Sequence, residues 1–346
     1  MDLDDFLTGQ KSMSKVGSRL LRNVTEEMRI YPVPVYHFDT ILDMDRQLKA
    51  ERGTGFMCID VKDDSMLAKV EVDYSSQVGV KGSFKTCHPV KIHPITVDDT
   101  NGAVQSLRNA FGSFNTVVAK RYYRPIEINV EGQVKKRILR LNDSEEELKH
   151  MLPEANCACI GNALMTQVYR YVDEFYKQNG EDQTLPIARI PRMRFIHSAL
   201  AIPANASVKA VLLLEEKIFG DFTKFVSNGR AQPLPDLSEA DQEAAEFLCF
   251  AQHFQYFYTK RHMFVSDFQG SYNGRTGLLT DCQIMTASKH GAGFADGNVE
   301  KAFYRFPSDH SCNKFCRYFE LSQLDAALAG SESESGEVEA EATRSH

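Results

Sequence analysis

Residues 253–316 constrain this chain more than any other stretch, because two kinds of metal-binding chemistry lie close together there. Two carboxylates and an amide provide the hard oxygen ligands that Mg²⁺ prefers. A histidine and two cysteines provide the nitrogen and sulfur ligands that zinc prefers. The oxygen ligands are Asp267, Gln269 and Asp281, and the softer ligands are His310, Cys312 and Cys316. Any fold for this chain therefore has to gather two separate sets of side chains within one short segment.

The composition is that of a globular protein. The chain has 346 residues, which suits one large two-lobed unit or two small domains, and 42% of them are hydrophobic. The net charge of −7 argues against nucleic acid as the main partner. No apolar run approaches the ~20 residues that span a membrane. The acidic N-terminus has no apolar signal core, so we expect a cytoplasmic protein, with a nuclear location as the alternative.

The eight cysteines are dispersed through the chain, and no secretory signal accompanies them. A disulfide framework is therefore not expected. Most of these cysteines fit the role of small, reduced core residues.

Apolar periodicity and breaker residues predict the order of the elements. A helix is possible over residues 16–28, and Pro32 and Pro34 break it. A strand over 116–123 carries Lys120, and helices are expected over 157–178 and 239–258. We expect an N-terminal extension at 1–45 that is partly disordered, an N-terminal lobe at 46–214, a C-terminal lobe at 215–329 and an acidic disordered tail at 330–346.

The softer ligands need a fourth member, because a structural zinc site is tetrahedral. If residues 311–326 are helical, Cys312 and Cys316 lie one turn apart on the same face. His253 lies on the apolar stripe of the 239–258 helix and is our choice for the fourth ligand. His262 and His290 are the alternatives. Without a metal, the two cysteines would simply be core residues.

The oxygen ligands suit phosphoryl transfer. That reaction needs a metal on the phosphates, a lysine and a residue that orients the acceptor hydroxyl. Lys120 at the end of an apolar strand is a candidate phosphate ligand. The simpler interpretation is that the acids lie at strand ends and that Lys120 reaches water.

Several motifs, in order, resemble those of the alpha-kinases, which are atypical Ser/Thr protein kinases. The resemblance covers about residues 75–328. The matching segments are Val117-Val-Ala-Lys120, Glu215 to Phe225, Phe250-Ala-Gln-His253, Asp267-Phe-Gln-Gly270, Leu279-Thr-Asp-Cys-Gln-Ile284, Phe294-Ala-Asp-Gly-Asn298 and His310-Ser-Cys312-Asn-Lys-Phe-Cys316.

The resemblance implies an α+β, two-lobed, protein-kinase-like fold with a structural zinc site in the C-terminal lobe. It also implies a protein serine/threonine kinase that uses ATP, Mg²⁺ and Zn²⁺ and takes a protein as substrate. Its site residues would be Asp267 and Lys224 for catalysis, Lys120, Glu215, Gly297 and Asn298 for ATP, Gln269 and Asp281 for magnesium, and His253, His310, Cys312 and Cys316 for zinc.

The chain departs from the family pattern in three ways. The connection Ser271–Gly277 is longer than the usual one, Glu300 and Phe303 stand where the family has glycines, and Cys282 replaces a proline. Glu300 and the long connection motivate a second interpretation, a pseudokinase that binds nucleotide without transferring phosphate. A third interpretation is a zinc-stabilised scaffold module with no nucleotide. The sequence leaves the substrate, the activating signal and the oligomeric state open.

Overall fold

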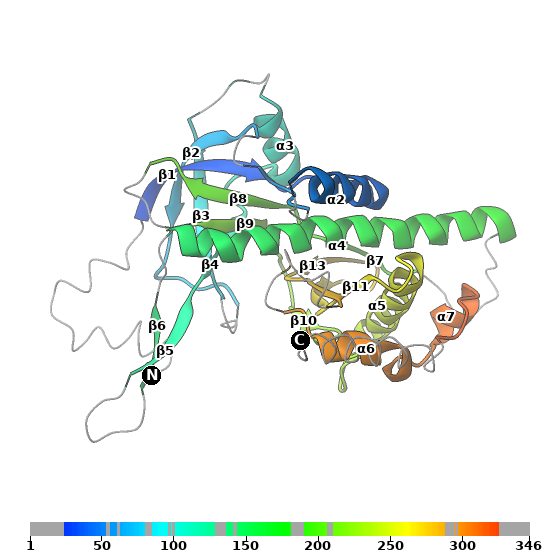
Figure 1. The fold of residues 1–346 in the computed structure, drawn as a ribbon. Coiled ribbons are helices and arrows are strands. Elements are labelled where there is room, and N and C mark those ends of the chain that lie inside the picture. The colour runs from blue at the N-terminus through cyan, green and yellow to red at the C-terminus, as the bar shows by residue number, and fades with distance from the viewer. Residues whose placement is uncertain are drawn as a thin grey trace, which may run out of the picture. The chain divides into compact units, whose positions relative to one another are not determined.

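The computed structural model describes residues 24–52, 56–60, 63–79, 85–95, 98, 101–128, 136–140, 144–180, 190–205, 210–287, 294 and 297–324. Its elements form two compact units (Figure 1). The first contains residues 1–34, 57–156 and 196–217, and the second contains 35–56, 157–195 and 218–346. These segments interleave along the chain, whereas the expected lobes were continuous in sequence.

The first unit is built on a closed antiparallel barrel. Alternate residues of its strands point inward, so that Met28, Ile30, Val70 and Leu212 meet in one core. The strand order is β1-β2-β3-β4-β9-β8. The bounds are Val24–Pro32 for β1, Met66–Val72 for β2, Lys85–Pro94 for β3, Val117–Tyr122 for β4, Ser198–Pro203 for β8 and Leu212–Glu216 for β9.

Strand β1 corrects our expectation for the N-terminus. Residues 24–32 do not continue a helix but pair with β2 and β8, with Met28 opposite both Ala68 and Pro203. The alternation of buried and exposed residues over this stretch is the reason, because it buries Met28 and Ile30 in the barrel core. Part of the expected extension at 1–45 is therefore a barrel strand. Residues 1–23 and the tail at 330–346 lie outside the described residues.

Two further elements complete the first unit. Helix α3 (Gly102–Phe111) begins at Asn101, whose side chain accepts a hydrogen bond from the backbone N–H of Val104. Its apolar face adds Leu107 and Phe111 to the barrel core. Strands β5 (Arg124–Ile128) and β6 (Lys136–Arg140) form a separate two-stranded ribbon.

Helix α4 (Ser144–Asn179) is longer than the sequence predicted, with 36 residues instead of the expected 157–178. It continues through Pro153 and has three acids in its first turn, where they complement the helix dipole. Residues 144–156 belong to the first unit and 157–179 to the second.

The second unit combines helices with two small sheets. Helix α5 (Glu239–Tyr258) has the predicted bounds, and the side chain of Ser238 caps it by accepting from the N–H of Asp241. One sheet has the order β10-β12-β13-β7, and β11 pairs with β14. The remaining bounds are Phe38–Arg52 for α2, Arg192–Phe195 for β7, Thr223–Lys224 for β10, Met263–Ser266 for β11, Gln269–Tyr272 for β12, Thr276–Thr280 for β13, Gln283–Thr286 for β14, Glu300–Asp309 for α6 and Lys314–Tyr318 for α7.

Aromatic side chains dominate the interior of the second unit. Phe250 of α5 stacks on Phe319 at a centroid distance of 5.0 Å, and Phe264 of β11 lies 4.2 Å from Phe306 of α6.

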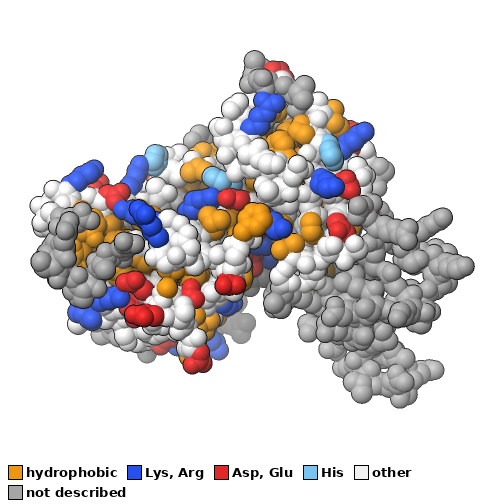
Figure 2. Space-filling model, turned by 180° about the vertical axis from the view of Figure 1, so that it is seen from behind, with side chains coloured by type: hydrophobic (Ala, Val, Ile, Leu, Met, Phe, Trp, Pro, Cys, Tyr) orange, Lys and Arg blue, Asp and Glu red, His pale blue; other side chains and the backbone are white. Residues whose placement is uncertain are grey.

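On the surface, charges of both signs are interspersed over the face in Figure 2. Among the described residues, no helix is long and apolar enough to cross a membrane.

Candidate active site and metal centre

The candidate catalytic residue Asp267 and the candidate magnesium ligand Asp281 lie at matching points of the second unit. β11 leads into β12 through Asp267 and Phe268, and β13 leads into β14 through Asp281 and Cys282. Because β11 pairs with β14 and β12 with β13, the two connections lie side by side where the chain passes from one sheet to the other. Both aspartates adopt left-handed backbone angles, with φ of 59° and 58°. Strained conformations of this kind cluster at functional sites.

Lys224 reaches Asp267 directly. Its Nζ lies 2.8 Å from Oδ1 of Asp267, which is almost fully buried, whereas the lysine is exposed. The contact follows from strand register, because Lys224 on β10 is opposite Gln269 on β12, two residues beyond Asp267. The contact is an ion pair, and Oδ1 of Asp267 has no partner with hydrogen-bond geometry among the described residues.

Gln269 and Asp281 are also in contact. The Nε2 of Gln269 donates to Oδ2 of Asp281 over 3.3 Å, and Gln269 lies opposite Thr280 in the sheet. The long connection between them is a hairpin closed by Asn273, whose side chain accepts from the N–H groups of Arg275 and Thr276. The extra residues are thus taken up at the hairpin end and leave the two candidate magnesium ligands adjacent.

Gly270 makes this close strand packing possible. A Cβ at this position would lie 1.8 Å from the carbonyl oxygen of Leu278, which no rearrangement of a side chain could relieve. Glycine is therefore required by close backbone approach at this point of the Asp267–Gly270 motif.

In the first unit, Lys120 is paired with an acid that the sequence analysis assigned another role. Its Nζ lies 2.9 Å from Oε2 of Glu215, and both side chains are buried. We had expected Glu215 to contact adenine through its backbone, which stays a prediction. A buried lysine requires a counter-charge, and strand register selects the acid, because Glu215 lies opposite Val118, on the same face of β4 as Lys120.

Gly297 and Asn298 begin the segment before α6. The side chain of Asn298 bonds both backbone groups of Thr286 on β14, at 3.1 Å each. A Cβ on Gly297 would lie 1.9 Å from Oε1 of Gln283, and Asn228 donates to the Gly297 carbonyl over 2.6 Å. Sequence reasoning missed Asn228 and Gln283, which determine the position of this segment only through the tertiary fold.

The four predicted soft ligands come together in the second unit. One donor atom from each of His253, His310, Cys312 and Cys316 lies within 4.8 Å of the others. The Sγ of Cys312 is 3.8 Å from Nδ1 of His253, and the Sγ of Cys316 is 3.5 Å from Nε2 of His310. Zinc–sulfur and zinc–nitrogen bonds of about 2.3 and 2.0 Å at a tetrahedral angle place such atoms about 3.5 Å apart. The cluster is therefore consistent with a zinc site.

Hydrogen bonding prepares His253 for a metal. Its Nε2 donates to the carbonyl of Ser322 over 3.0 Å, which leaves the lone pair on Nδ1, the nitrogen that faces Cys312. Burial lowers the pKa of His253 to about 4, and burial together with His253 lowers the pKa of His310 to about 4. Both rings are thus neutral near pH 7. Burial raises the pKa of Cys316 to about 12, so this thiol needs a bound cation to ionise.

The local geometry of the cysteines differs from the helical case considered for residues 311–326. Helix α7 begins only at Lys314, and Cys312 precedes it. Asn313 starts the helix by accepting from the N–H groups of Phe315 and Cys316. The capped turn, rather than helical spacing, brings the two thiols together. Of the alternative ligands, His262 is exposed and bonds the carbonyl of Lys260, and His290 lies outside the described residues.

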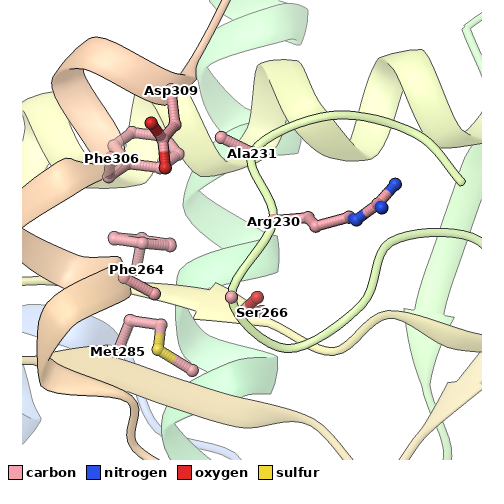
Figure 3. A pocket seen from close by; sticks show the side chains of 9 residues that line it. Arg230, Ala231, Phe264, Ser266, Met285, Phe306 and Asp309 are labelled. Carbon is pink, nitrogen blue, oxygen red and sulfur yellow. The ribbon is translucent and has the colours of Figure 1, made fainter.

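A small cavity lies between β11, β14, α6 and the loop around Arg230 (Figure 3). Its volume is about 10 Å³, the lower limit for a single water molecule. Phe264, Met285 and Phe306 give it apolar walls, and Arg230 points away from them. A nucleotide does not fit there.

Comparison with known proteins now identifies the family. The model of the alpha-kinase family matches residues 81–316. The chain belongs to the alpha-kinase family. The match covers most of the chain and includes both aspartate turns and the entire His/Cys cluster, so the α+β alpha-kinase fold expected from the sequence is confirmed.

Two curated alpha-kinases resemble part of the chain. Alpha-protein kinase 2 of Danio rerio is 36% identical over 114 residues, and the protein of the same name from Mus musculus is 32% identical over 114 residues. Each alignment covers 32% of this chain and 5% of the relative, so the chain spans only a small part of these proteins. Among solved structures, an alpha kinase from Entamoeba histolytica has a TM-score of 0.52 at 15% identity, over 88% of this chain and 93% of that chain. This similarity supports the fold alone.

Proposed function

We propose that this alpha-kinase is an active protein serine/threonine kinase that transfers the γ-phosphate of Mg-ATP to a protein hydroxyl. The observation that carries the proposal is the pair of aspartate turns, where Lys224 contacts Asp267 and Gln269 contacts Asp281. Two ordered carboxylates beside a lysine and an amide are the parts that phosphoryl transfer requires.

In this proposal, Asp267 accepts a hydrogen bond from the Ser or Thr hydroxyl of the substrate and orients it for attack. Lys224 keeps the Asp267 carboxylate in place. Lys120 binds the phosphates of ATP, and the acid of Glu215 holds its ammonium group until nucleotide arrives. The segment of Glu215 would also contact adenine, and Gly297 and Asn298 would lie near the phosphates or the substrate.

Two metals belong to the proposal. The amide oxygen of Gln269 and the carboxylate of Asp281 would hold Mg²⁺, which neutralises phosphate charge when bound. The fit is chemical, because the contact between these residues uses the amide nitrogen and leaves the amide oxygen as a hard ligand. His253, His310, Cys312 and Cys316 would hold Zn²⁺ in a structural role.

The structure weakens the argument for a pseudokinase. That alternative depended on the long connection Ser271–Gly277, which ends in an ordinary hairpin. Glu300 lies in the first turn of α6, where an acid complements the helix dipole. Both features therefore have a structural explanation that does not require loss of catalysis.

The test is phosphate transfer to a basic protein substrate by the purified chain with Mg-ATP. Asp267→Asn should lower the rate by at least about 100-fold, because it removes the acceptor that orients the hydroxyl. Asparagine tolerates the left-handed backbone, so this variant should still fold. Asp236→Asn is the matched control, because Asp236 is an exposed aspartate with φ of 62°.

Wild-type incorporation no greater than that of Asp267→Asn would contradict the proposal. Thermal stabilisation by Mg-ATP without transfer would instead favour a pseudokinase, and no response to nucleotide would favour a scaffold module.

A further inference from the structure

The turn that carries Asp281 is attached to helix α4 by the next residue. Cys282 is 4% exposed, and its Sγ lies 3.2 Å from the carbonyl oxygen of Cys157. The thiol donates to this carbonyl, so the β13–β14 connection is bonded to the helix at the position that follows Asp281. Cys282 is also the residue that departs from the family's proline, which has neither a thiol nor an N–H.

Helix α4 has a recess that accepts this thiol. Gly161 lies one turn after Cys157 and is buried. A Cβ at Gly161 would lie 2.8 Å from Sγ of Cys282 and 3.3 Å from a ring carbon of Phe195. A helix is less stable with glycine than with alanine at an interior position, so the glycine at this point needs a packing reason. The close contact with the thiol of Cys282 provides that reason.

The seated thiol constrains Asp281 because the two residues are adjacent and the backbone at Asp281 is left-handed. Aspartate enters the left-handed region more readily than most residues, so the position of the turn depends on what holds the two strands beside it. On one side of Asp281, the pairing of Thr280 with Gln269 holds β13. On the other side, the contact of Cys282 with α4 holds the start of β14. Together they maintain Asp281 within 3.3 Å of Gln269.

We propose that Gly161 and Cys282 are positioning residues for Asp281, and that their contact determines the magnesium affinity of the site. This inference rests on the proposed function, because Asp281 is a proposed magnesium ligand. It predicts an effect on metal binding rather than only on stability. Residues that orient metal ligands typically change affinity by about 10- to 100-fold when substituted.

The experiment measures nucleotide binding by the full-length chain as a function of Mg²⁺, by calorimetry with ADP, together with the Mg²⁺ dependence of phosphate transfer. Gly161→Ala should raise the Mg²⁺ concentration at half-saturation by about 10-fold or more, because the added methyl displaces Cys282. Cys282→Ala should have a similar effect, since it removes the donor. Cys282→Ser keeps a donor and should restore a magnesium dependence close to that of wild type.

Two controls separate positioning from general destabilisation. Gly102→Ala adds a methyl to a helix where no atom beyond the adjoining residues and the helix's own backbone lies within 4 Å of the new Cβ. Cys159→Ala removes another buried thiol of α4. Both should leave the magnesium dependence unchanged, even if Cys159→Ala lowers the melting temperature.

The outcomes of the two proposals are distinguishable. If wild type binds no magnesium nucleotide and transfers no phosphate, the proposed function fails. If wild type binds but Gly161→Ala and Cys282→Ala change only the melting temperature, the positioning role is overturned. If Gly161→Ala does not fold, the comparison of Cys282→Ala with Cys282→Ser decides.

Discussion

Lys120 and Arg121 are neighbours on β4, and strand alternation sends their side chains to opposite faces. Arg121 shares the face of Val117 and Ala119, which belong to the barrel core. Its Nε lies 3.1 Å from Oε1 of Glu147, a fully buried acid of α4. Lys120 pairs with Glu215 on the other face. Arg121, which has a structural role, and Lys120, a candidate phosphate ligand, are therefore adjacent residues on opposite faces of one strand.

The buried acid Glu147 should make the stability of the first unit depend on pH. Its Oε2 also accepts from the backbone N–H of Val211 over 2.8 Å. Burial, opposed by Arg121, raises the pKa of Glu147 from 4.5 to about 7. Between these two pKa values, Glu147 therefore keeps its proton in the folded state but has lost it in the unfolded state. The contribution of this group is most favourable at low pH and is lost as the pH rises through about 7.

Glu147→Gln removes the titrating group, and urea unfolding at pH 5 to 8 measures the effect. The free energy of unfolding of wild type relative to this variant should fall by up to about 1.4 kcal/mol per pH unit over the range below pH 7. Burial raises the pKa of the nearby Tyr74 above its ordinary value of 10, so Tyr74 stays neutral over this pH range. Burial also raises the pKa of Glu26, whose charge in turn raises the pKa of Glu147. Glu146→Gln, at the more exposed neighbouring residue of α4, is the control. A difference that stays constant with pH would rule out titration of Glu147 in this range.

At the level of elements, α7 shows how a very short helix is stabilised by its surroundings. It has five residues, far fewer than a helix needs to form alone. Asn313 caps it and also donates from Nδ2 to the carbonyl of Glu246 on α5, over 2.6 Å. Phe315 and Cys316 are fully buried against neighbouring elements. Capping and packing thus replace helix propensity, and they position Cys316 in the His/Cys cluster.

Asn313→Ala should destabilise α7 and weaken zinc binding by the His/Cys cluster. Loss of the cap costs about 1 kcal/mol, and the contact with α5 is lost as well. A chelator with an optical signal should report faster zinc release, and calorimetry should report a lower melting temperature. Asn313→Ser keeps a capping oxygen and loses only the donor to Glu246, so its effect should be smaller. Equal zinc release from wild type and Asn313→Ala would contradict this account.

At the scale of the molecule, the His/Cys cluster links parts of the second unit that are distant in sequence. His253 belongs to α5, His310 follows α6, and the two cysteines flank the start of α7. Near these ligands the chain relies on aromatic packing, such as Phe250 on Phe319. A metal shared by three segments would therefore contribute directly to the folding of this unit.

Metal removal should destabilise the second unit. The purified chain should contain about one zinc, and a strong chelator should lower its melting temperature, because binding energy at such a site is folding energy. His310→Ala should mimic the chelator and abolish its further effect. Cys159→Ala, a buried cysteine outside the cluster, should retain the metal. Metal analysis well below one zinc per chain in native protein would contradict the four-ligand site.

Local patterns were sufficient for some elements and not for others. The apolar stripe and the Ser238 cap predicted α5 with its observed bounds, since both signals lie within the helix itself. β1 was missed because its alternation becomes informative only when β2 and β8 pair with it. The start of α4 was missed because its first turns are polar, apart from buried residues such as Met151 that pack within the first unit.

The sequence by itself determined the family and the residue types of both candidate sites, because motif order and ligand chemistry are properties of the chain. It also predicted that His253 faces inward, since helical spacing decides that. Only the tertiary structure decided that Asp267 and Asp281 occupy adjacent left-handed turns and that Glu215 pairs with Lys120. Only the fold revealed the recess at Gly161 that seats Cys282. These features depend on register and close packing between distant segments, which no local pattern of residues encodes.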